Sequence, residues 1–479
     1  MDLTRARRID EVTWELGTEY APGMIVPVRF LADELLVGQI GTDRSLEQLI
    51  NVAMLPGITR FAIGMPDLHE GYGFPVGGVA ATLTPDGAIS PGGIGFDINC
   101  GVRLLATNLE LARITPWLET FVHELSRAIP TGYGRHGRLV LERHQLERVL
   151  LEGAGYVVRE LGLGVPADLT RCEGSGQLPD AEPAGVSARA RERGEDQLGT
   201  LGGGNHFIEV QRVVQLYDEP AARAFGLFKG QLTVLIHTGS RGLGHQVCLD
   251  HLGVMDRVSG SYGFTPPDRQ LACVPFGSPE GRSYFGAMCA AANFAFANRQ
   301  LLTHRVRQVL GRILGPHFPH PVASTVYDVA HNTAKLESHG GRLVCVHRKG
   351  ATRALGPSGF ELPDVYRGVG QPVFIPGSMG TASYVLVGTD ESAELSFSSC
   401  CHGAGRALSR TAAKHQVQGH VLRKELEARG IVVRCPSNLE LAEEAPAAYK
   451  DIDRVVEVVA RAGIARKVAR LEPVGVLKG

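Results

Sequence analysis

The segment PGGIGFDINCGVR, from Pro91 to Arg103, places a carboxylate and a thiol three residues apart, at Asp97 and Cys100. Histidines in similar surroundings follow in the segments GGGNHFIEV, IHTGSRGLGH, VAHNTAK and SCCHGAGRALSR, at His206, His237, His331 and His402. Carboxylate, thiolate and imidazole groups together are ligands for borderline divalent metal ions. Because each lies beside glycine or asparagine at the end of an apolar run, we expect their loops to converge on one site.

These side chains suffice for two metal ions if one ligand is shared. The five candidates are Asp97, Cys100, His206, His237 and His331. A thiolate can bridge two metals, whereas a single tetrahedral zinc site would leave a ligand over. Carboxylate and imidazole groups without a cluster of thiolates would also accommodate manganese.

Glycine clusters lie close to several of the candidate ligands. The chain has 60 glycines, many of them in residues 71–78, 91–95, 201–205, 375–381 and 401–405. Glycine is favoured where the backbone needs a positive φ or must approach a ligand closely. Backbone amides in such loops bind anions, so the clusters indicate a phosphate or nucleotide site.

The pattern of apolar residues predicts a mixture of strands and helices. We expect short strands and turns in residues 1–100, helices in 116–163, and a polar surface excursion in 164–198 whose Arg/Glu run at 189–195 is solvated. Strands are expected at 231–240, 324–337 and 341–354, and helices at 283–314 and 437–464. The candidate site residues are spread along the chain without a linker, which favours one α+β domain over residues 1–479.

The composition is that of an ordinary globular protein, with 44% hydrophobic and 21% charged residues. The formal net charge of −1 excludes a strongly basic nucleic-acid-binding protein but leaves room for a local basic patch. Nine cysteines without a CxxC motif favour a reducing compartment. We find neither a signal peptide nor the roughly 18 uncharged apolar residues of a membrane span, and expect a cytoplasmic protein without a membrane partner.

Six motifs in one order resemble a known family. DINCGVR, LGTLGGGNHF, HTGSRGLGH, AHN, CHGAGR and the terminal VGVLKG are similar to those of the RtcB RNA-splicing ligases, and the resemblance runs from about Met65 to Gly479. It implies a single α+β domain of RtcB type, with mixed sheets and glycine-rich loops converging on a binuclear metal site.

The resemblance also implies an activity. RtcB ligases join RNA 3′-phosphate or 2′,3′-cyclic phosphate ends to 5′-hydroxyl ends, in tRNA splicing or RNA repair. They use GTP and two Mn²⁺ ions, and pass through a histidine–GMP intermediate and an activated RNA–ppG end. An archease-like activator is a possible partner.

The resemblance assigns roles to individual residues. His402 would be the nucleophile and Asp67 the carboxylate that orients it, while Asp97, Cys100, His206, His237 and His331 would bind the metals, with Cys100 bridging. The implied GTP contacts are Asn205, His206, Phe207, Ile208, Glu209, His331, Asn332, Pro376, Gly377, Ser378, Met379, Ser383, His402, Gly403, Ala404, Gly405, Tyr449 and Lys478. Position near these motifs and phosphate-binding chemistry add Lys349, Arg353, Arg406 and Arg410 as RNA contacts.

Two other classes of function compete with a ligase. A binuclear metallohydrolase acting on cyclic or terminal phosphates would use the ligands but leave His402 and Lys478 without a role. A non-catalytic RNA-binding protein fits the composition poorly, because the chain is nearly neutral and only 6% aromatic, which leaves little surface for base stacking.

Overall fold

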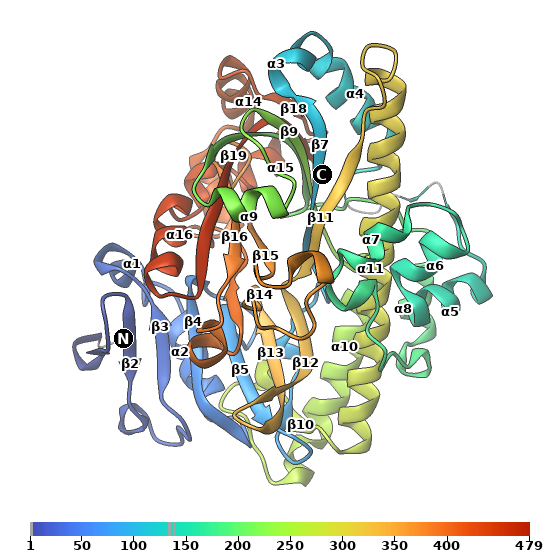
Figure 1. Cartoon of the computed structure of the whole chain (residues 1–479). Coiled ribbons are helices and arrows are strands. Elements are labelled where there is room, and N and C mark those ends of the chain that lie inside the picture. Colours follow the sequence, from blue (N-terminus) through green and yellow to red (C-terminus); the bar gives the residue numbers. More distant parts are fainter. Residues whose placement is uncertain (1–2, 133–135, 138) are drawn as a thin grey trace.

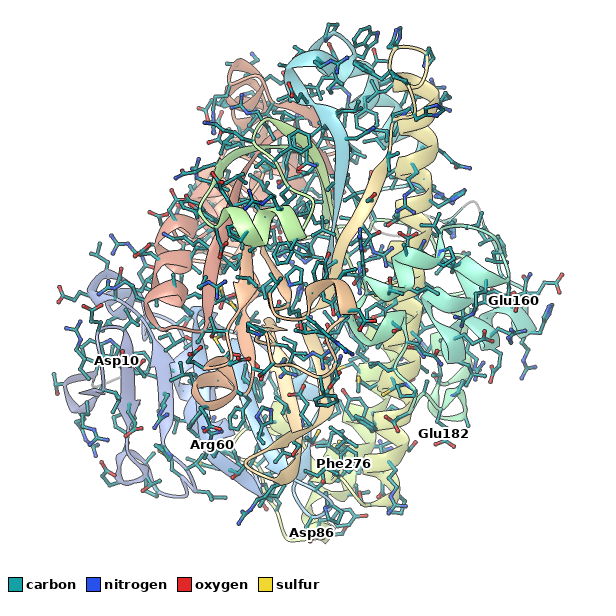
Figure 2. The ribbon with its side chains drawn as sticks, viewed as in Figure 1. Asp10, Arg60, Asp86, Glu160, Glu182 and Phe276 are labelled. Carbon is teal, nitrogen blue, oxygen red and sulfur yellow. The ribbon has the colours of Figure 1, made fainter. Side chains whose placement is uncertain are left out.

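The computed structural model describes residues 3–132, 136–137 and 139–479. Two large sheets dominate it, with helices packed around them (Figure 1). The predicted α+β architecture is confirmed. Charged side chains such as Asp10, Asp86 and Glu160 point outward from the ribbon (Figure 2).

The first sheet has seven strands, in the spatial order β1-β2-β3-β4-β5-β13-β12. Their bounds are β1 (Arg7–Arg8), β2 (Thr13–Leu16), β3 (Val28–Leu31), β4 (Ile58–His69), β5 (Val76–Leu83), β13 (Arg342–Lys349) and β12 (Asn332–His339). The β3–β4 pair is parallel and the other pairs are antiparallel. Helices α1 (Glu34–Gln39), α2 (Ser45–Val52) and α16 (Ile452–Arg461) contribute side chains to the hydrophobic core on this sheet.

The second sheet has eight strands, seven of them in the order β11-β7-β9-β8-β19-β16-β15. The bounds are β11 (Ala323–Ala330), β7 (Gly101–Glu110), β9 (Gln231–Thr238), β8 (Phe207–Leu216), β19 (Ala465–Lys478), β16 (Ser383–Gly388) and β15 (Pro372–Ile375). The eighth, β18 (Val432–Arg434), runs parallel to the end of β19. Buried and exposed side chains do not alternate along β9 and β11, in which nearly every residue is buried, because both faces of the sheet are covered.

Helix α11 (Pro279–Leu314) is a single 36-residue helix along one side of the molecule (right in Figure 1). Its many alanines and glycines leave space for close packing against α10 (Arg241–Val258), α4 (Leu118–Ala128), α5 (Arg143–Glu152) and α6 (Ala154–Arg159). The remaining elements are short: α3 (Leu111–Ile114), α7 (Pro166–Thr170), α8 (Ala188–Glu192), α9 (Glu219–Ala224), α12 (Ser392–Ser396), α13 (Arg410–Gln416), α14 (Gly419–Ala428), α15 (Asn438–Glu443), β6 (Ala88–Ile89), β10 (Val274–Pro275), β14 (Ala351–Arg353) and β17 (Ser399–Cys401).

Along the chain, one residue separates a strand of the second sheet from a strand of the first. Strand β11 ends at Ala330 on an edge of the second sheet, and β12 begins at Asn332 on an edge of the first. His331 lies between them, so it is placed where both sheets end. The backbone N–H of His331 donates to the carbonyl of Cys100 (2.9 Å), which ties this crossing to the start of β7.

Two sequence-based expectations need correction. Residues 164–198 are not a surface excursion, because Asp168, Glu173 and Leu178 are buried beneath α11. Residues 1–100, expected to hold strands and turns, also contain α1 and α2, whereas the segment 437–464 is helical as predicted, in α15, a 3-10 helix (Pro446–Ala448) and α16. The predicted strands at 231–240, 324–337 and 341–354 are confirmed; residues 133–135 and 138, in the region expected to be helical, lie outside the described part. In the part of the chain that the structure describes, no helix is both long and apolar enough to cross a bilayer.

Candidate functional site

Four neighbouring strands of the second sheet place candidate residues at one end. Val102 of β7 pairs with His237 of β9 across the sheet. His237 pairs in turn with Phe207 of β8, and Phe207 pairs with Lys478 of β19. Cys100 directly precedes β7 and His206 directly precedes β8. Hydrogen bonding between strands therefore brings Cys100, His206, His237 and Lys478 together, although 378 residues separate the first from the last.

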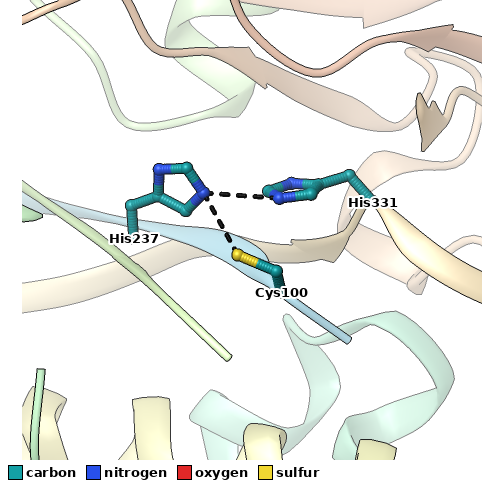
Figure 3. Close-up of side chains that lie close together, drawn as sticks. All are labelled: Cys100, His237 and His331. Carbon is teal, nitrogen blue, oxygen red and sulfur yellow. Dashed lines mark hydrogen bonds between the residues drawn. The ribbon is translucent and has the colours of Figure 1, made fainter. Parts of the chain in front are cut away.

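The candidate metal ligands form two groups that share Cys100. Cys100 Sγ lies 3.4 Å from Nε2 of His237, and that Nε2 lies 3.3 Å from Nε2 of His331 (Figure 3). On the other side, Cys100 Sγ lies 3.5 Å from Nε2 of His206, which lies 2.6 Å from Oδ2 of Asp97. Within each group the ligand atoms lie within 4.8 Å of one another. The five side chains therefore converge as two overlapping sets of three.

The chemistry of this cluster fits divalent metal ions. Burial lowers the pKa of His237 and of His331 well below the usual range, so both imidazoles are neutral and carry a lone pair. Burial raises the pKa of Asp97, but the neighbouring His206 outweighs this and holds it at about 2. Burial raises the pKa of the Cys100 thiol well above its usual range, and a bound cation would reverse this by stabilising the thiolate. A shared thiolate suits two borderline cations.

A buried carboxylate holds His402 beside this cluster. Asp67, on β4, accepts hydrogen bonds at Oδ2 from Nδ1 of His402 (2.7 Å) and from the backbone N–H groups of His402 (3.1 Å) and Gly403 (3.3 Å). The proton is thereby placed on Nδ1, and Nε2 keeps its lone pair. His402 follows β17, and the centre of its ring lies 4.8 Å from the centre of the His331 ring.

Lys450 and Gly405 fix the backbone around Asp67. The Lys450 ammonium donates to the carbonyls of Leu68 (2.5 Å) and Pro66 (3.3 Å), on either side of Asp67, and its N–H donates to the Gly405 carbonyl (2.9 Å). Gly405 has φ of +75°, and a Cβ there would come within 2.2 Å of the Asp67 carbonyl oxygen. Only glycine satisfies both requirements, which explains one glycine of the CHGAGR motif.

The metal-ligating cluster and His402 open into one cavity of about 650 Å³. Among the described residues, the predicted site residues that line it are Asp97, Cys100, Asn205, His206, Phe207, His237, His331, Asn332, Lys349, Pro376, Gly377, His402, Gly403, Ala404, Gly405, Arg406, Arg410 and Tyr449. This volume is within the range of small-molecule and cofactor sites.

Other predicted site residues lie behind the cavity wall. Ile208 and Met379 are buried in hydrophobic clusters, and Ser378 is also buried. Ser383 is buried as well, with Oγ accepting from the Gly377 N–H (3.2 Å) and from Gln211 Nε2 (3.0 Å). The same Gln211 donates to Glu209 Oε2 (2.8 Å), and the Lys478 ammonium lies 5.3 Å from the centre of the Phe207 ring.

The four predicted RNA contacts differ in accessibility. Lys349 lines the cavity with its ammonium donating to the carbonyls of Tyr72 (2.7 Å) and Gly92 (3.1 Å), and burial lowers its pKa to about 7. Arg406 and Arg410 also line the cavity. Arg353 does not: its side chain is 2% exposed and pairs with Glu173 (3.4 Å) and Glu361 (2.6 Å). The expected RNA contact at Arg353 is therefore wrong, because its guanidinium is enclosed and already neutralised.

The structure adds residues that the sequence analysis missed. The cavity is also lined by Gln197, Arg241 and His245. Arg193 lines it too, although it belongs to the run 189–195 that was expected to be a solvated face. Glu444, which is 2% exposed, lies between Arg406 (3.3 Å), Arg410 (3.4 Å) and Lys478 (3.9 Å) and accepts a hydrogen bond from the Tyr449 hydroxyl. Arg241 and His245 fall within the HTGSRGLGH motif, so the sequence could have indicated them as site residues. No sequence motif contains Glu444.

This fold and site define a class of protein: an α+β protein in which a candidate metal-binding cluster with a shared thiol and a carboxylate-held histidine open into one cavity. The family model described as tRNA-splicing ligase RtcB matches residues 48–479. The chain belongs to the RtcB family, as the motifs predicted.

Curated relatives align over nearly the whole chain. A protein of Archaeoglobus fulgidus named tRNA-splicing ligase RtcB is 51% identical over 99% of this chain and 98% of its own length. Another of that name from Thermococcus kodakarensis is 52% identical over 100% of both chains. The RNA-splicing ligase RtcB of Mycobacterium tuberculosis is 52% identical over 90% of this chain and 100% of its own.

Proposed function

We propose that this protein is a GTP- and Mn²⁺-dependent RNA ligase that joins a 3′-phosphate or 2′,3′-cyclic phosphate end to a 5′-hydroxyl end. The observation that carries the proposal is the carboxylate-held His402 beside the two overlapping ligand groups, in a cavity large enough for a nucleotide. Membership of the RtcB family and the names of the relatives support it. The cytoplasm as its location, tRNA halves or damaged RNA as substrates, and an archease-like activator are further parts of the proposal.

His402 would take the first step. Its Nε2 lone pair attacks the α-phosphorus of GTP, the bond to the pyrophosphate oxygen breaks, and a P–N bond to GMP forms. Asp67 keeps the proton on Nδ1 and stabilises the positive charge that the ring acquires. An oxygen of the RNA 3′-phosphate then attacks that phosphorus, the P–N bond breaks, and RNA–ppG forms. Finally the 5′-hydroxyl oxygen loses its proton, attacks the terminal RNA phosphorus, and GMP leaves.

Asp97, Cys100, His206, His237 and His331 would hold the metals, with Cys100 shared. When bound, the ions would neutralise phosphate charge and polarise the reacting phosphates. A cyclic phosphate must first be opened by water to the 3′-phosphate in the same cavity.

The walls of the cavity suit the two substrates. The backbone of Ala404 and Gly405 would offer N–H groups to phosphates, while Asn205, Phe207 and Tyr449 provide a wall for the guanosine. Burial raises the pKa of Glu209 to about 8, and its Oε1 has no hydrogen-bond partner in the structure. Guanine has N–H donors on one edge, and Glu209, which lies behind the cavity wall, would accept from them as an ionised carboxylate.

Cations around the cavity would hold RNA phosphates. Arg193, Arg241, Lys349, Arg406 and Arg410 all contribute to its lining. Guanidinium groups bind phosphate oxygens in a bidentate way. This local concentration of charge reconciles RNA binding with a net charge of −1.

A joining assay tests the proposal. An RNA with a 3′-phosphate and a second RNA with a 5′-hydroxyl are incubated with Mn²⁺, with and without GTP. We expect joined RNA and one GMP and one pyrophosphate released per junction, in the GTP samples only. Joining without GTP consumption would contradict the histidine–GMP route.

A binuclear metallohydrolase is the second candidate, favoured by the ligand cluster taken alone. It predicts release of inorganic phosphate from the 3′-phosphate RNA, or opening of the cyclic phosphate, without joining. The same samples, analysed for free phosphate, separate the two candidates.

Replacing Asp67 by asparagine is expected to slow the transfer of GMP to the protein about a hundredfold. The asparagine oxygen can still accept the three N–H groups that converge on Oδ2, but a neutral amide does not stabilise the charge developing on His402. Single-turnover labelling with [α-³²P]GTP measures the rate, and metal content serves as the control. An unchanged rate would refute the role of Asp67.

A further inference from the structure

Of the DINCGVR motif, only Asp97 and Cys100 line the cavity. Asn99 and Gly101 do not line it, although they flank the candidate ligand Cys100, and neither does Arg103. They lie instead around the guanidinium of Arg299, which projects from α11 and is fully buried. The motif therefore carries a second structural unit beneath the metal-ligating cluster.

Arg299 contacts each chain segment that carries a ligand of the Cys100–His237–His331 group. Its Nη1 donates to the carbonyls of Asn99 (2.8 Å) and Thr238 (3.0 Å), next to Cys100 and His237 respectively. Its Nε donates to Oδ1 of Asp328 (2.9 Å), on the strand β11 that leads into His331. One rigid, planar group thus ties together the ends of β7, β9 and β11.

The surrounding backbone is built for this close approach. A Cβ on Gly101 would lie 3.0 Å from the Arg299 guanidinium and 2.3 Å from the carbonyl oxygen of Val329. Asn99 has φ of +52°, so its side-chain oxygen can accept from Nη2 of Arg299 (3.1 Å) while its amide donates to the Ala292 carbonyl (2.7 Å). Asparagine is one of the few residues that adopt this left-handed conformation readily.

We propose that Arg299, anchored by Asp328, is a positioning residue for the metal cluster: it fixes the separation of the ligand atoms of Cys100, His237 and His331. Without it, the carbonyls of Asn99 and Thr238 lose their donor, and the strand ends that carry the ligands are free to shift. The ligands must then be reorganised when metal binds, which weakens binding. The inference rests on the metal binding in the proposed function.

Arg103 offers a matched control. It is as fully buried as Arg299 and donates to Oδ2 of Asp328 (2.7 Å), which also accepts from Arg299 (3.0 Å). Its remaining hydrogen bonds go to Gln300 Oε1 (2.5 Å) and Thr303 Oγ1 (3.1 Å) on α11 and to Cys172 Sγ (3.9 Å), not to the segments beside Cys100 or His237. Loss of either arginine leaves Asp328 with one cationic partner fewer, so both variants report the general cost of the buried ion pair.

The test compares Arg299→Met with Arg103→Met in the full chain. Mn²⁺ binding is measured from the paramagnetic resonance signal of the free ion, and ligation by Cys100 from the Co²⁺–thiolate absorption band. Melting temperatures are measured without metal. We expect both variants to have a lower melting temperature than the wild type. Only Arg299→Met is expected to raise the dissociation constant for Mn²⁺ about 10- to 100-fold and to weaken the Co²⁺–thiolate band. Arg299→Lys is expected to restore binding in part.

Equal dissociation constants for the two variants, or a wild-type value for Arg299→Met, would overturn the inference. Wild-type protein that binds no metal would instead refute the metal binding in the proposed function, so the two failures are distinguishable. If Arg299→Met does not fold, Asn99→Ala removes the Oδ1 acceptor of Arg299, together with the amide that donates to the Ala292 carbonyl. Unchanged metal affinity in that variant would also overturn the inference.

Discussion

Replacing His402 by alanine is expected to abolish covalent labelling by [α-³²P]GTP, reducing the labelled fraction at least about a thousandfold. The reason is that Nε2 of His402 is the one protein nucleophile in the proposed mechanism, and Asp67 already fixes its tautomer. In the wild type the label should be acid-labile and resistant to hydroxylamine, as a phosphoramidate is. Denaturing gels of the labelled proteins make the measurement.

His251→Ala is the matched control for this loss. His251, on α10, has the same exposed fraction as His402, 8%. It bonds through Nε2 to the Gly185 carbonyl (3.1 Å), and it does not line the cavity. We expect it to retain labelling. The backbone N–H of residue 402 keeps its bond to Asp67 in the alanine variant, so folding and metal content should persist. Undiminished labelling of His402→Ala would refute the assignment of the nucleophile.

Replacing Cys100 by alanine is expected to disrupt both metal positions at once. Cys100 is the one member shared by the two ligand groups, so its loss leaves two ligands in each. We expect two Mn²⁺ per chain in the wild type and fewer than one in the variant after dialysis against the same metal concentration. GMP labelling should fall at least about a thousandfold with the metal, because the phosphates of GTP lose their counter-charge.

Cys273→Ala separates this effect from the loss of a buried thiol. Cys273 is 1% exposed and packs in the hydrophobic core of the first sheet, away from the ligand groups. We expect it to keep both metals and its labelling. Elemental analysis of the dialysed proteins gives the metal content, and two tightly bound metals in Cys100→Ala would show that the thiolate does not bridge them.

The chemistry at the centre of the site was open to prediction because it depends on local signals. Asp97 and Cys100 are close in the sequence, and each histidine stands where an apolar strand meets a turn. Such strand ends gather at one edge of a sheet, and the structure brings the five candidate ligands into two groups with the shared thiol that their number suggested. The α+β class followed in the same way from hydrophobic periodicity.

Other predictions failed where they depended on the path of the chain. Arg353 carries the right group for RNA binding, but β14 turns it inward onto Glu173 and Glu361. Arg193 lies in a run with the composition of a solvated face, yet it lines the cavity because the segment folds back over α10. Charge alone does not distinguish these two fates.

The sequence by itself determined which residue types are available, the order of the motifs, and hence the family and the kind of chemistry. Only the tertiary structure decided the partners: that one oxygen of Asp67 accepts all three N–H groups of the 402–403 segment, that Glu444 lies among Arg406, Arg410 and Lys478, and that Arg299 joins the three ligand-bearing segments. The physical reason is that residue type and local pattern are short-range properties, whereas burial and charge pairing arise from contacts between segments hundreds of residues apart.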